Sequence, residues 1–413
     1  MPSRRSVLIL VLATLVAISV IAPGGAFEPP PAVARLKDMG REITYAVLVG
    51  LFLTAALNLL FTLRGARPGV VVWAYSGFFI FTGAKFVYYD LVGPGLLYFG
   101  VFALYFVTFG LFLPKLSRSG LFDLDAAVTV IGLANLLAVA INLPTSFMAG
   151  TSSFYGRFSG LAFNANILAY ALVLTSVCLQ ATVRNIPYRA LRTPALMLGL
   201  GLNFYLIFLT QSRGGLILLV VSMLINFYFW NRTLFRVALV LSPCLMLLGW
   251  LFFLNSPLYG VIFADRGDTR GWVFERQWNS FMASPFFGDP WMDSRIVYGE
   301  NLLLGAIAEM GLFGLLFVSL ICLPRLVQFY RLGWRRRLPT LRLRQDHQLA
   351  AAFVAVTILS GGLESMLLGV VGPAIICFLV LDAASQSWKL PVRRMMQDLA
   401  AGAGGPALNG QPS

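Results

Sequence analysis

Residues 195–230 read ALMLGLGLNFYLIFLTQSRGGLILLVVSMLINFYFW and carry a single charged side chain, that of Arg213. A helix needs about 20 apolar residues, each rising 1.5 Å, to cross the hydrocarbon core of a bilayer. The stretch is long enough for two such helices, at 194–211 and 214–230, which meet at residues 210–215 with almost no loop between them. It therefore predicts two membrane spans joined by a tight turn.

Similar apolar runs fill most of the chain. Of its 413 residues, 58% are hydrophobic and 12% are charged, with a mean hydropathy of +0.80, whereas soluble domains have about 25% charged residues. This composition excludes a soluble or disordered protein and predicts an all-α, polytopic membrane protein with about 12 transmembrane helices. A single membrane domain would cover residues 1–398, followed by a disordered tail at 399–413. The predicted spans are 6–22, 43–63, 69–89, 93–113, 122–143, 161–183, 194–211, 214–230, 237–255, 301–323, 349–364 and 366–385.

The basic residues fall on one side of this arrangement. If Arg4 and Arg5 hold the N-terminus in the cytoplasm, most of the other 29 Lys and Arg residues also lie in cytoplasmic connections or in the tail. This bias is typical of membrane topology, so the net charge of +14 gives no reason to expect nucleic acid as a partner. Both termini are predicted to be cytoplasmic. The first run is also compatible with a cleaved signal peptide.

One long connection, 256–300, is predicted on the opposite, periplasmic side. It contains Trp272, Trp278 and Trp291 between charges of alternating sign. Within it, residues 270–282 predict a short helix with Phe274, Trp278 and Phe281 on one face. Two interpretations stay open: an amphipathic helix lying on the bilayer, or a lid over a membrane-embedded site.

Two further features are predicted on the same side. Arg213, between Ser212 and Gly214, would either extend to water or bind an anion, with the free N–H groups of the following helix as a phosphate cradle. Arg157, Asn164 and Asn166 stand at the entry of the sixth span, where the two amides could bridge helices or orient sugar hydroxyls.

Acid–base chemistry on this side would require a carboxylate. His347, the one histidine, follows an arginine-rich cytoplasmic connection and is predicted to be solvated or at headgroup level. Glu300 is the best-placed candidate base, and Glu364 is a weaker one. Asp123 and Asp125 have the D-x-D spacing of some metal-dependent transferases, but acidic residues also favour a helix start, and we predict no metal there.

Several of these segments resemble one family when taken in order. RFSGLAFNAN at 157–166 resembles an R-x-S-G-x-x-x-N-x-N motif, and TQSRGG at 210–215 resembles T-x-S-R-G. TRGW at 269–272, SPFFG at 284–288, ENLLL at 300–304 and EMGLFG at 309–314 follow in the same order. Together they resemble the O-antigen ligase/polymerase superfamily of bacterial inner membranes over residues 155–320.

The resemblance implies a multi-span glycosyltransferase whose active site faces the periplasm. Its donor would be an oligosaccharide linked to polyprenyl diphosphate, transferred to a glycan acceptor with inversion and without a metal or other cofactor. Arg213 and Arg270 would bind the diphosphate, and Glu300 would act as the catalytic base. The ligases have histidine at that position, so Glu300 favours a polysaccharide polymerase. Residues implied to contact the glycan are Arg157, Asn164, Asn166, Ser212, Trp272 and Asn301.

Alternative functions remain at this point. A ligase would transfer the glycan to lipid A core or to protein, and a chain-length regulator is a further expected partner of a polymerase. A flippase for the same lipid-linked glycan would carry ionisable groups within the bilayer, for which Lys85 and Glu309 are the candidates. A scaffold for an envelope assembly complex would not depend on the periplasmic arginines.

Overall fold

The computed structural model describes residues 3–21, 31–61, 67–147, 153–154, 157–162, 164–241, 269–288, 301–335, 340–362, 367–368 and 371–386. In these residues the chain is all-α apart from two short antiparallel strands, β1 (Ser153–Phe154) and β2 (Arg157–Phe158). The helices are α1 (Arg4–Ile18), α2 (Pro31–Phe61), α3 (Val70–Tyr88), α4 (Val92–Tyr105), α5 (Leu113–Arg118), α6 (Leu124–Asn142), α7 (Ala165–Ser176), α8 (Leu179–Val183), α9 (Arg189–Thr210), α10 (Arg213–Trp230), α13 (Thr269–Ala283), α15 (Leu302–Met310), α16 (Leu312–Tyr330), α17 (Leu341–Gly361) and α18 (Pro373–Ala384). A π-helical turn, Phe106–Phe112, joins α4 to α5, a 3-10 turn, Pro144–Phe147, follows α6, and a second π-helical turn, Arg331–Arg335, follows α16.

Seven helical stretches of the described chain are long and apolar enough to cross a membrane, which confirms a polytopic helical membrane protein. The prediction of about 12 spans is not confirmed by this count, since α7 and α18 are apolar but shorter. Residues 242–268, 289–300 and 387–413 lie outside the described residues, and with them much of the ninth predicted span, most of the long connection and the tail. The seven stretches are Glu42–Leu60, Val70–Tyr88, Val92–Arg118, Leu124–Phe147, Arg189–Thr210, Arg213–Trp230 and Leu312–Trp334.

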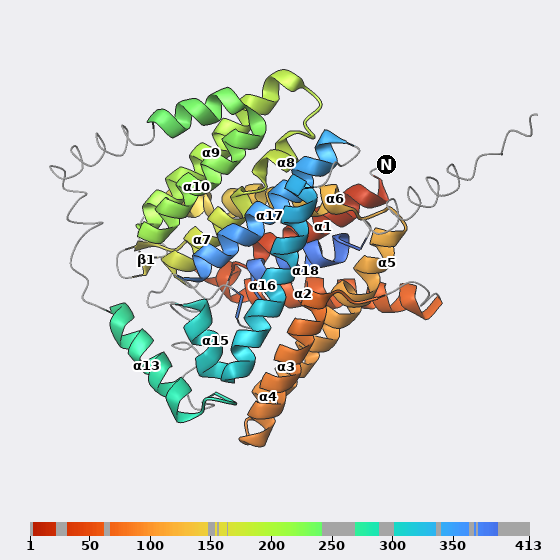
Figure 1. Ribbon diagram of the computed structural model, residues 1–413, viewed down its shortest axis with the longest axis vertical. Helices are drawn as coiled ribbons and strands as arrows, with labels where there is room; N and C mark the ends of the chain where they lie inside the picture. Colours follow the sequence, from red (N-terminus) through yellow and green to blue (C-terminus); the bar gives the residue numbers. More distant parts are fainter. Residues whose placement is uncertain are drawn as a thin grey trace, which may run out of the picture.

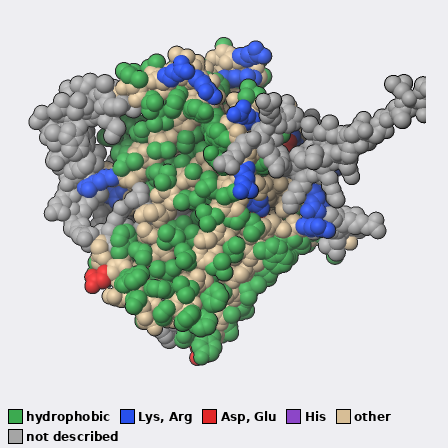
Figure 2. All heavy atoms as spheres, viewed as in Figure 1, with side chains coloured by type: hydrophobic (Ala, Val, Ile, Leu, Met, Phe, Trp, Pro, Cys, Tyr) green, Lys and Arg blue, Asp and Glu red, His purple; other side chains and the backbone are tan. Residues whose placement is uncertain are grey.

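The bundle has two distinct ends. In Figure 1, β1 lies at the left of the bundle with α13 and α15 below it, whereas the N-terminus and α5 lie on the right. We call the first end the β1 side. Figure 2 shows Lys and Arg side chains gathered mostly along the top and right of the face drawn, with hydrophobic side chains covering its middle. An apolar middle with a basic end is the surface expected of a protein solvated by lipid.

Polar side chains join the central helices inside the bundle. Asn135 on α6 and Asn203 on α9 exchange amide hydrogen bonds of 2.9 and 2.8 Å. The hydroxyls of Ser176 on α7 and Ser222 on α10 lie 2.7 Å apart. Hydrogen bonds between spanning helices each contribute about 0.6 to 2 kcal/mol in membranes. They fix the positions of α7, α9 and α10, whose ends form the candidate site.

The tenth predicted span, 301–323, is interrupted. Gly311 has a φ of 59°, a backbone conformation that glycine tolerates and other residues rarely adopt. The break leaves α15 as a short helix folded back against α16, so closely that a Cβ on Gly314 would lie 2.0 Å from the carbonyl oxygen of Ala306. The spanning helix therefore begins at Leu312, and Glu309 lies at the end of a separate short helix on the β1 side.

Candidate functional site

Arg157 connects two motifs that are distant in the sequence. Its Nε donates to the backbone carbonyl of Thr210, at the end of α9, over 2.8 Å, and its Nη2 donates to Oδ1 of Asn166, in the first turn of α7, over 2.7 Å. The planar guanidinium binds the two acceptors through two different nitrogens in a fixed geometry, which the single ammonium nitrogen of a lysine would not reproduce. The structure thus brings the RFSGLAFNAN and TQSRGG segments together on the β1 side.

The turn between α9 and α10 presents Arg213. Gln211 ends α9 in the left-handed conformation, with a φ of 52°. The buried Ser212 caps α10, its Oγ accepting a hydrogen bond of 3.3 Å from the N–H of Gly215. Arg213 is the first residue of α10 and is exposed. A guanidinium thus stands at a helix N-terminus, where N–H groups and the helix dipole favour an anion.

Gly215 serves helix packing. A Cβ at this position would lie 2.8 Å from the Cβ of Ala169 on α7, closer than side chains ordinarily approach. The absence of a side chain lets α10 pack closely on α7. This packing keeps the turn that carries Arg213 next to the residues that Arg157 binds. Gly215 therefore has a structural role in the packing of α10 on α7.

Gly215→Ala is expected to lower the free energy of unfolding by about 1–3 kcal/mol, because the added methyl group overpacks the contact with Ala169. The control is Gly201→Ala on α9, where a Cβ would meet nothing within 4 Å and the better helix propensity of alanine gains about 0.5–1 kcal/mol. Unfolding in mixed detergent micelles measures both. Equal effects of the two substitutions would contradict the packing role.

Two asparagines expected to contact the glycan are helix caps. Asn164 accepts from the N–H of Ile167 over 2.8 Å and so starts α7. Asn301 starts α15 by accepting from the N–H groups of Leu303 and Leu304, and its amide donates to the carbonyl of Gly362 over 3.3 Å. These bonds explain both residues structurally. Their contact with a glycan stays a prediction.

The predicted helix at 270–282 is present as α13 and packs on α15. Trp272 is 55% exposed, and Arg276 lies over its ring at 5.5 Å from the centroid. Arg270 stands in the first turn of α13, but its side chain lies outside what the structure describes, as does Glu300. The structure therefore places the helix of Arg270 on the β1 side. The joint binding of a diphosphate by Arg213 and Arg270, which we call the arginine clasp, and the role of Glu300 as the base stay predictions.

The end of α13 is tied to α15 and α16. The N–H of Leu312 donates to the carbonyl of Pro285 over 2.8 Å. A Cβ on Gly288, whose φ is 73°, would lie 2.2 Å from the carbonyl oxygen of Glu309. The SPFFG and EMGLFG segments are thus in direct contact, which the sequence motifs alone did not indicate.

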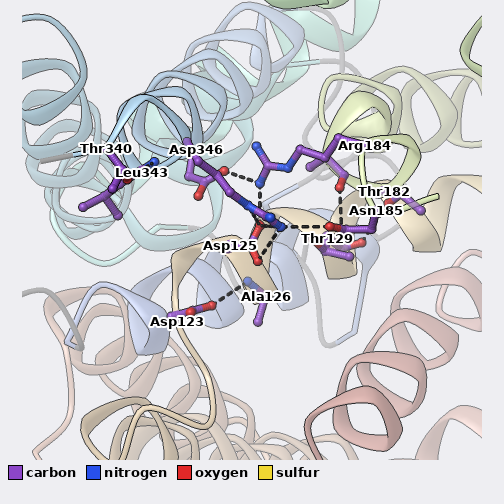
Figure 3. Close-up of polar contacts among 12 residues, drawn as sticks. Asp123, Asp125, Ala126, Thr129, Thr182, Arg184, Asn185, Thr340, Leu343 and Asp346 are labelled. Carbon is purple, nitrogen blue, oxygen red and sulfur yellow. Dashed lines mark hydrogen bonds and ion pairs between the residues drawn. The ribbon is translucent and has the colours of Figure 1, made fainter. Parts of the chain in front are cut away.

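The D-x-D carboxylates lie at the opposite end of the bundle and bind arginines (Figure 3). Asp123 caps α6 by accepting from the N–H of Ala126 over 2.8 Å. It also accepts from Arg5 over 2.8 Å. Asp125 accepts from Arg5, Arg184 and Arg342. These guanidinium groups occupy the positions that a cation would take, so the pair joins helix ends, as expected for acidic residues at a helix start.

The other members of this cluster were not predicted from the sequence. Arg184 also pairs with Asp346, which is 1% exposed on α17. Burial raises the pKa of Asp346 to about 6, because the loss of hydration outweighs the attraction of Arg184. Charges of opposite sign near the ends of neighbouring spans were the available signal, but their pairing depends on the fold.

The raised pKa of Asp346 predicts a pH effect. Between its ordinary pKa of 3.8 and about 6, the folded chain holds this proton more tightly than the unfolded chain does. The stability contributed by that proton is fully present below pH 3.8, the ordinary pKa, and is lost as the pH rises through the folded-state pKa of about 6. Asp346→Asn should therefore flatten the fall in unfolding free energy between about pH 4 and pH 6. Parallel pH profiles of variant and parent would contradict this assignment.

The prediction for His347 is wrong. The residue is 1% exposed, its Nδ1 lies 2.8 Å from the carbonyl oxygen of Leu343, and its ring meets Phe329 edge-on. It is buried because α17 begins at Leu341, about two turns of helix before the predicted span, and this helix packs against α16. The residue still lies at the end of α17 that is remote from the β1 side.

Two further ion pairs are buried between helices. Arg325 on α16 pairs with Asp382 on α18, which is 0% exposed and also accepts from the N–H of Val72 at the start of α3. Lys85 on α3 lies 3.7 Å from Oε1 of Glu309 on α15 and donates to its backbone carbonyl. Both pairs hold together helices that are far apart in the sequence.

Fold and surface define the chain as a polytopic, all-α membrane protein. Its candidate site on the β1 side consists of Arg213 and the neighbouring contacts of Arg157. A comparison with protein-family models and one with curated proteins each found no match.

Proposed function

We propose that this protein is a membrane glycosyltransferase of the polysaccharide polymerase type, acting on a polyprenyl-diphosphate-linked glycan at the β1 side. The observation that carries the proposal is the pair of hydrogen bonds from Arg157 to Thr210 and Asn166. These bonds join RFSGLAFNAN and TQSRGG, two of the segments that resemble the superfamily, next to the exposed Arg213 at the N-terminus of α10. Arginine side chains and helix N-termini both bind phosphate, so this site suits a diphosphate leaving group.

In the proposed reaction, the hydroxyl oxygen of the acceptor sugar attacks the anomeric carbon of the donor. The bond between that carbon and the phosphate oxygen breaks, the polyprenyl diphosphate leaves, and the acceptor proton passes to the carboxylate of Glu300. Arg213 and Arg270 neutralise the negative charge that develops on the departing diphosphate. Attack opposite the leaving group inverts the anomeric configuration.

The location of the site is part of the proposal. The β1 side is assigned to the periplasm of a bacterial inner membrane, because the basic cluster around Arg184 and Arg342 lies at the other end of the bundle and basic residues favour the cytoplasm. Both termini would then be cytoplasmic. Between polymerase and ligase, the carboxylate at position 300 favours the polymerase, because the ligases of the resembling superfamily have histidine there.

A transporter of the same lipid-linked glycan is the second candidate. The buried pairs Lys85–Glu309 and Arg325–Asp382 favour it, since transporters carry paired ionisable groups among their spans. In the described structure, however, each pair ties helices together at one end of the bundle. We therefore assign both pairs a structural role.

Reconstitution separates the two functions. Purified protein in liposomes is supplied with a polyprenyl-diphosphate-linked repeat unit, and the products are resolved by glycan length. Longer glycans are expected if the protein is a polymerase. Translocation of the lipid-linked unit without elongation would overturn the proposal in favour of transport, and transfer of the glycan only to added lipid A core would identify a ligase.

A further inference from the structure

One face of α13 is fixed against the protein. Gln277 and Ser280 are 0% and 5% exposed, on the helix that packs against α15. The backbone hydrogen bond from Leu312 to Pro285 holds the turn that follows. The rotation of α13 about its own axis is therefore set by these contacts, and the directions of its remaining faces follow from it.

The other two faces of α13 differ in character. Successive residues of an α-helix are about 100° apart, so positions i, i+4 and i+8 form a stripe. Glu275 and Asn279 form an exposed polar stripe. Phe274, Trp278 and Met282 form an apolar stripe beside it, in which Trp278 and Met282 are 49% and 58% exposed. A row of large exposed apolar side chains beside a polar stripe is typical of a helix that borders lipid on one side and water on the other.

The apolar stripe continues onto a surface that belongs to the membrane spans. Phe286 and Phe287, in the turn after α13, are 64% and 60% exposed. The ring of Phe287 stacks on Phe81 of α3 at 6.5 Å and lies 6.1 Å from Phe313 of α16. Phe81 is seven residues before the end of α3, about 10 Å along the helix, so Phe287 lies at the depth of a spanning segment.

We propose that α13 and the turn 284–287 are embedded in the lipid–water interface on the β1 side. Phe274, Trp278 and Met282 lie among the phospholipid acyl chains together with Phe286 and Phe287, and the stripe of Glu275 and Asn279 faces water. Adjacent apolar and polar stripes are the property of helices that lie in the plane of a membrane interface. Membrane lipid is thus the partner of this surface.

This placement gives α13 a fixed depth. Its start, which carries Arg270 and Trp272, is held at the membrane surface on the same side as Arg213. The inference requires only that the chain spans a bilayer, and it does not depend on the proposed transferase activity.

Site-directed spin labelling tests the placement. Single substitutions Glu275→Cys, Trp278→Cys, Asn279→Cys and Met282→Cys are labelled with a nitroxide and reconstituted in liposomes of phosphatidylethanolamine and phosphatidylglycerol. Power-saturation measurements compare collisions with oxygen, which concentrates in the acyl chains, and with a water-soluble nickel complex. All four residues are exposed, so the labels fit without entering the core. Unsubstituted protein carried through the same labelling gives the background from native cysteines.

Labels at 278 and 282 are expected to collide several-fold more with oxygen than with nickel, and labels at 275 and 279 should show the reverse. Nickel accessibility at 278 and 282 equal to that at 275 and 279 would overturn the proposal, because the whole exposed surface would then border water. Labels at 278 and 282 shielded from both reagents would also overturn it, because another protein surface would then cover the stripe.

Discussion

Arg213→Lys is expected to reduce the rate of glycan elongation by about 100-fold or more, the loss typical of removing one preorganised donor to a developing negative charge. The guanidinium presents a planar fork that binds two phosphate oxygens, whereas the ammonium of lysine is a point charge. The change preserves the positive charge, so a large loss would identify the fork as the requirement. The measurement is the initial rate of chain extension in liposomes.

Arg189→Lys is the matched control. Arg189 is the first residue of α9 and is exposed, just as Arg213 is the first residue of α10, but the whole length of α9, about 33 Å for 22 residues, separates it from the site. Elongation by this variant should equal that of the parent. The same loss is expected for Arg270→Lys, and full activity of both Arg213→Lys and Arg270→Lys would show that no arginine clasp exists.

Arg325→Leu is expected to cost about 3–5 kcal/mol of unfolding free energy, since it leaves the carboxylate of Asp382 buried without its counter-charge. Asp382 also accepts from the N–H of Val72 at the start of α3. The loss therefore weakens a junction of α3, α16 and α18. Unfolding in mixed micelles, followed by tryptophan fluorescence, gives the free energy.

A second variant distinguishes charge from packing. Arg325→Leu combined with Asp382→Asn removes the unpaired charge and keeps an oxygen that can accept from Val72, so this double variant should be more stable than Arg325→Leu alone. Arg236→Leu, at an exposed position, should change stability by less than about 0.5 kcal/mol. A double variant no more stable than Arg325→Leu would mean that lost packing of the arginine side chain explains the effect.

The membrane class could be predicted from hydropathy because lipid imposes long apolar helices on any spanning segment. The break at Gly311 could not, since residues 301–323 form one long run that is apolar apart from a few residues such as Glu309, and a positive φ leaves no hydropathy signal. The partition of 161–183 into α7 and α8 was missed for the same reason. Such breaks are set by tertiary packing.

The residues of the candidate site could be predicted from the sequence, but most of the hydrogen bonds and ion pairs between them could not. Sequence motifs placed Arg157 and Arg213 on one side of the membrane, and the structure adds the hydrogen bonds of Arg157 to Thr210 and Asn166. Asn164 could be foreseen as a cap because a short polar residue before an apolar run is a helix start signal. The pairing of Lys85 with Glu309 could not, since it joins residues 224 apart in the chain.

The central claim is that the arginine at the start of α10 binds a lipid diphosphate. Its most direct test is the dissociation constant of a polyprenyl diphosphate for the protein in nanodiscs, measured for the parent, Arg213→Lys and Arg189→Lys. We predict that binding weakens at least about tenfold, or 1.4 kcal/mol, for Arg213→Lys alone. Equal affinity for the three proteins would contradict the account.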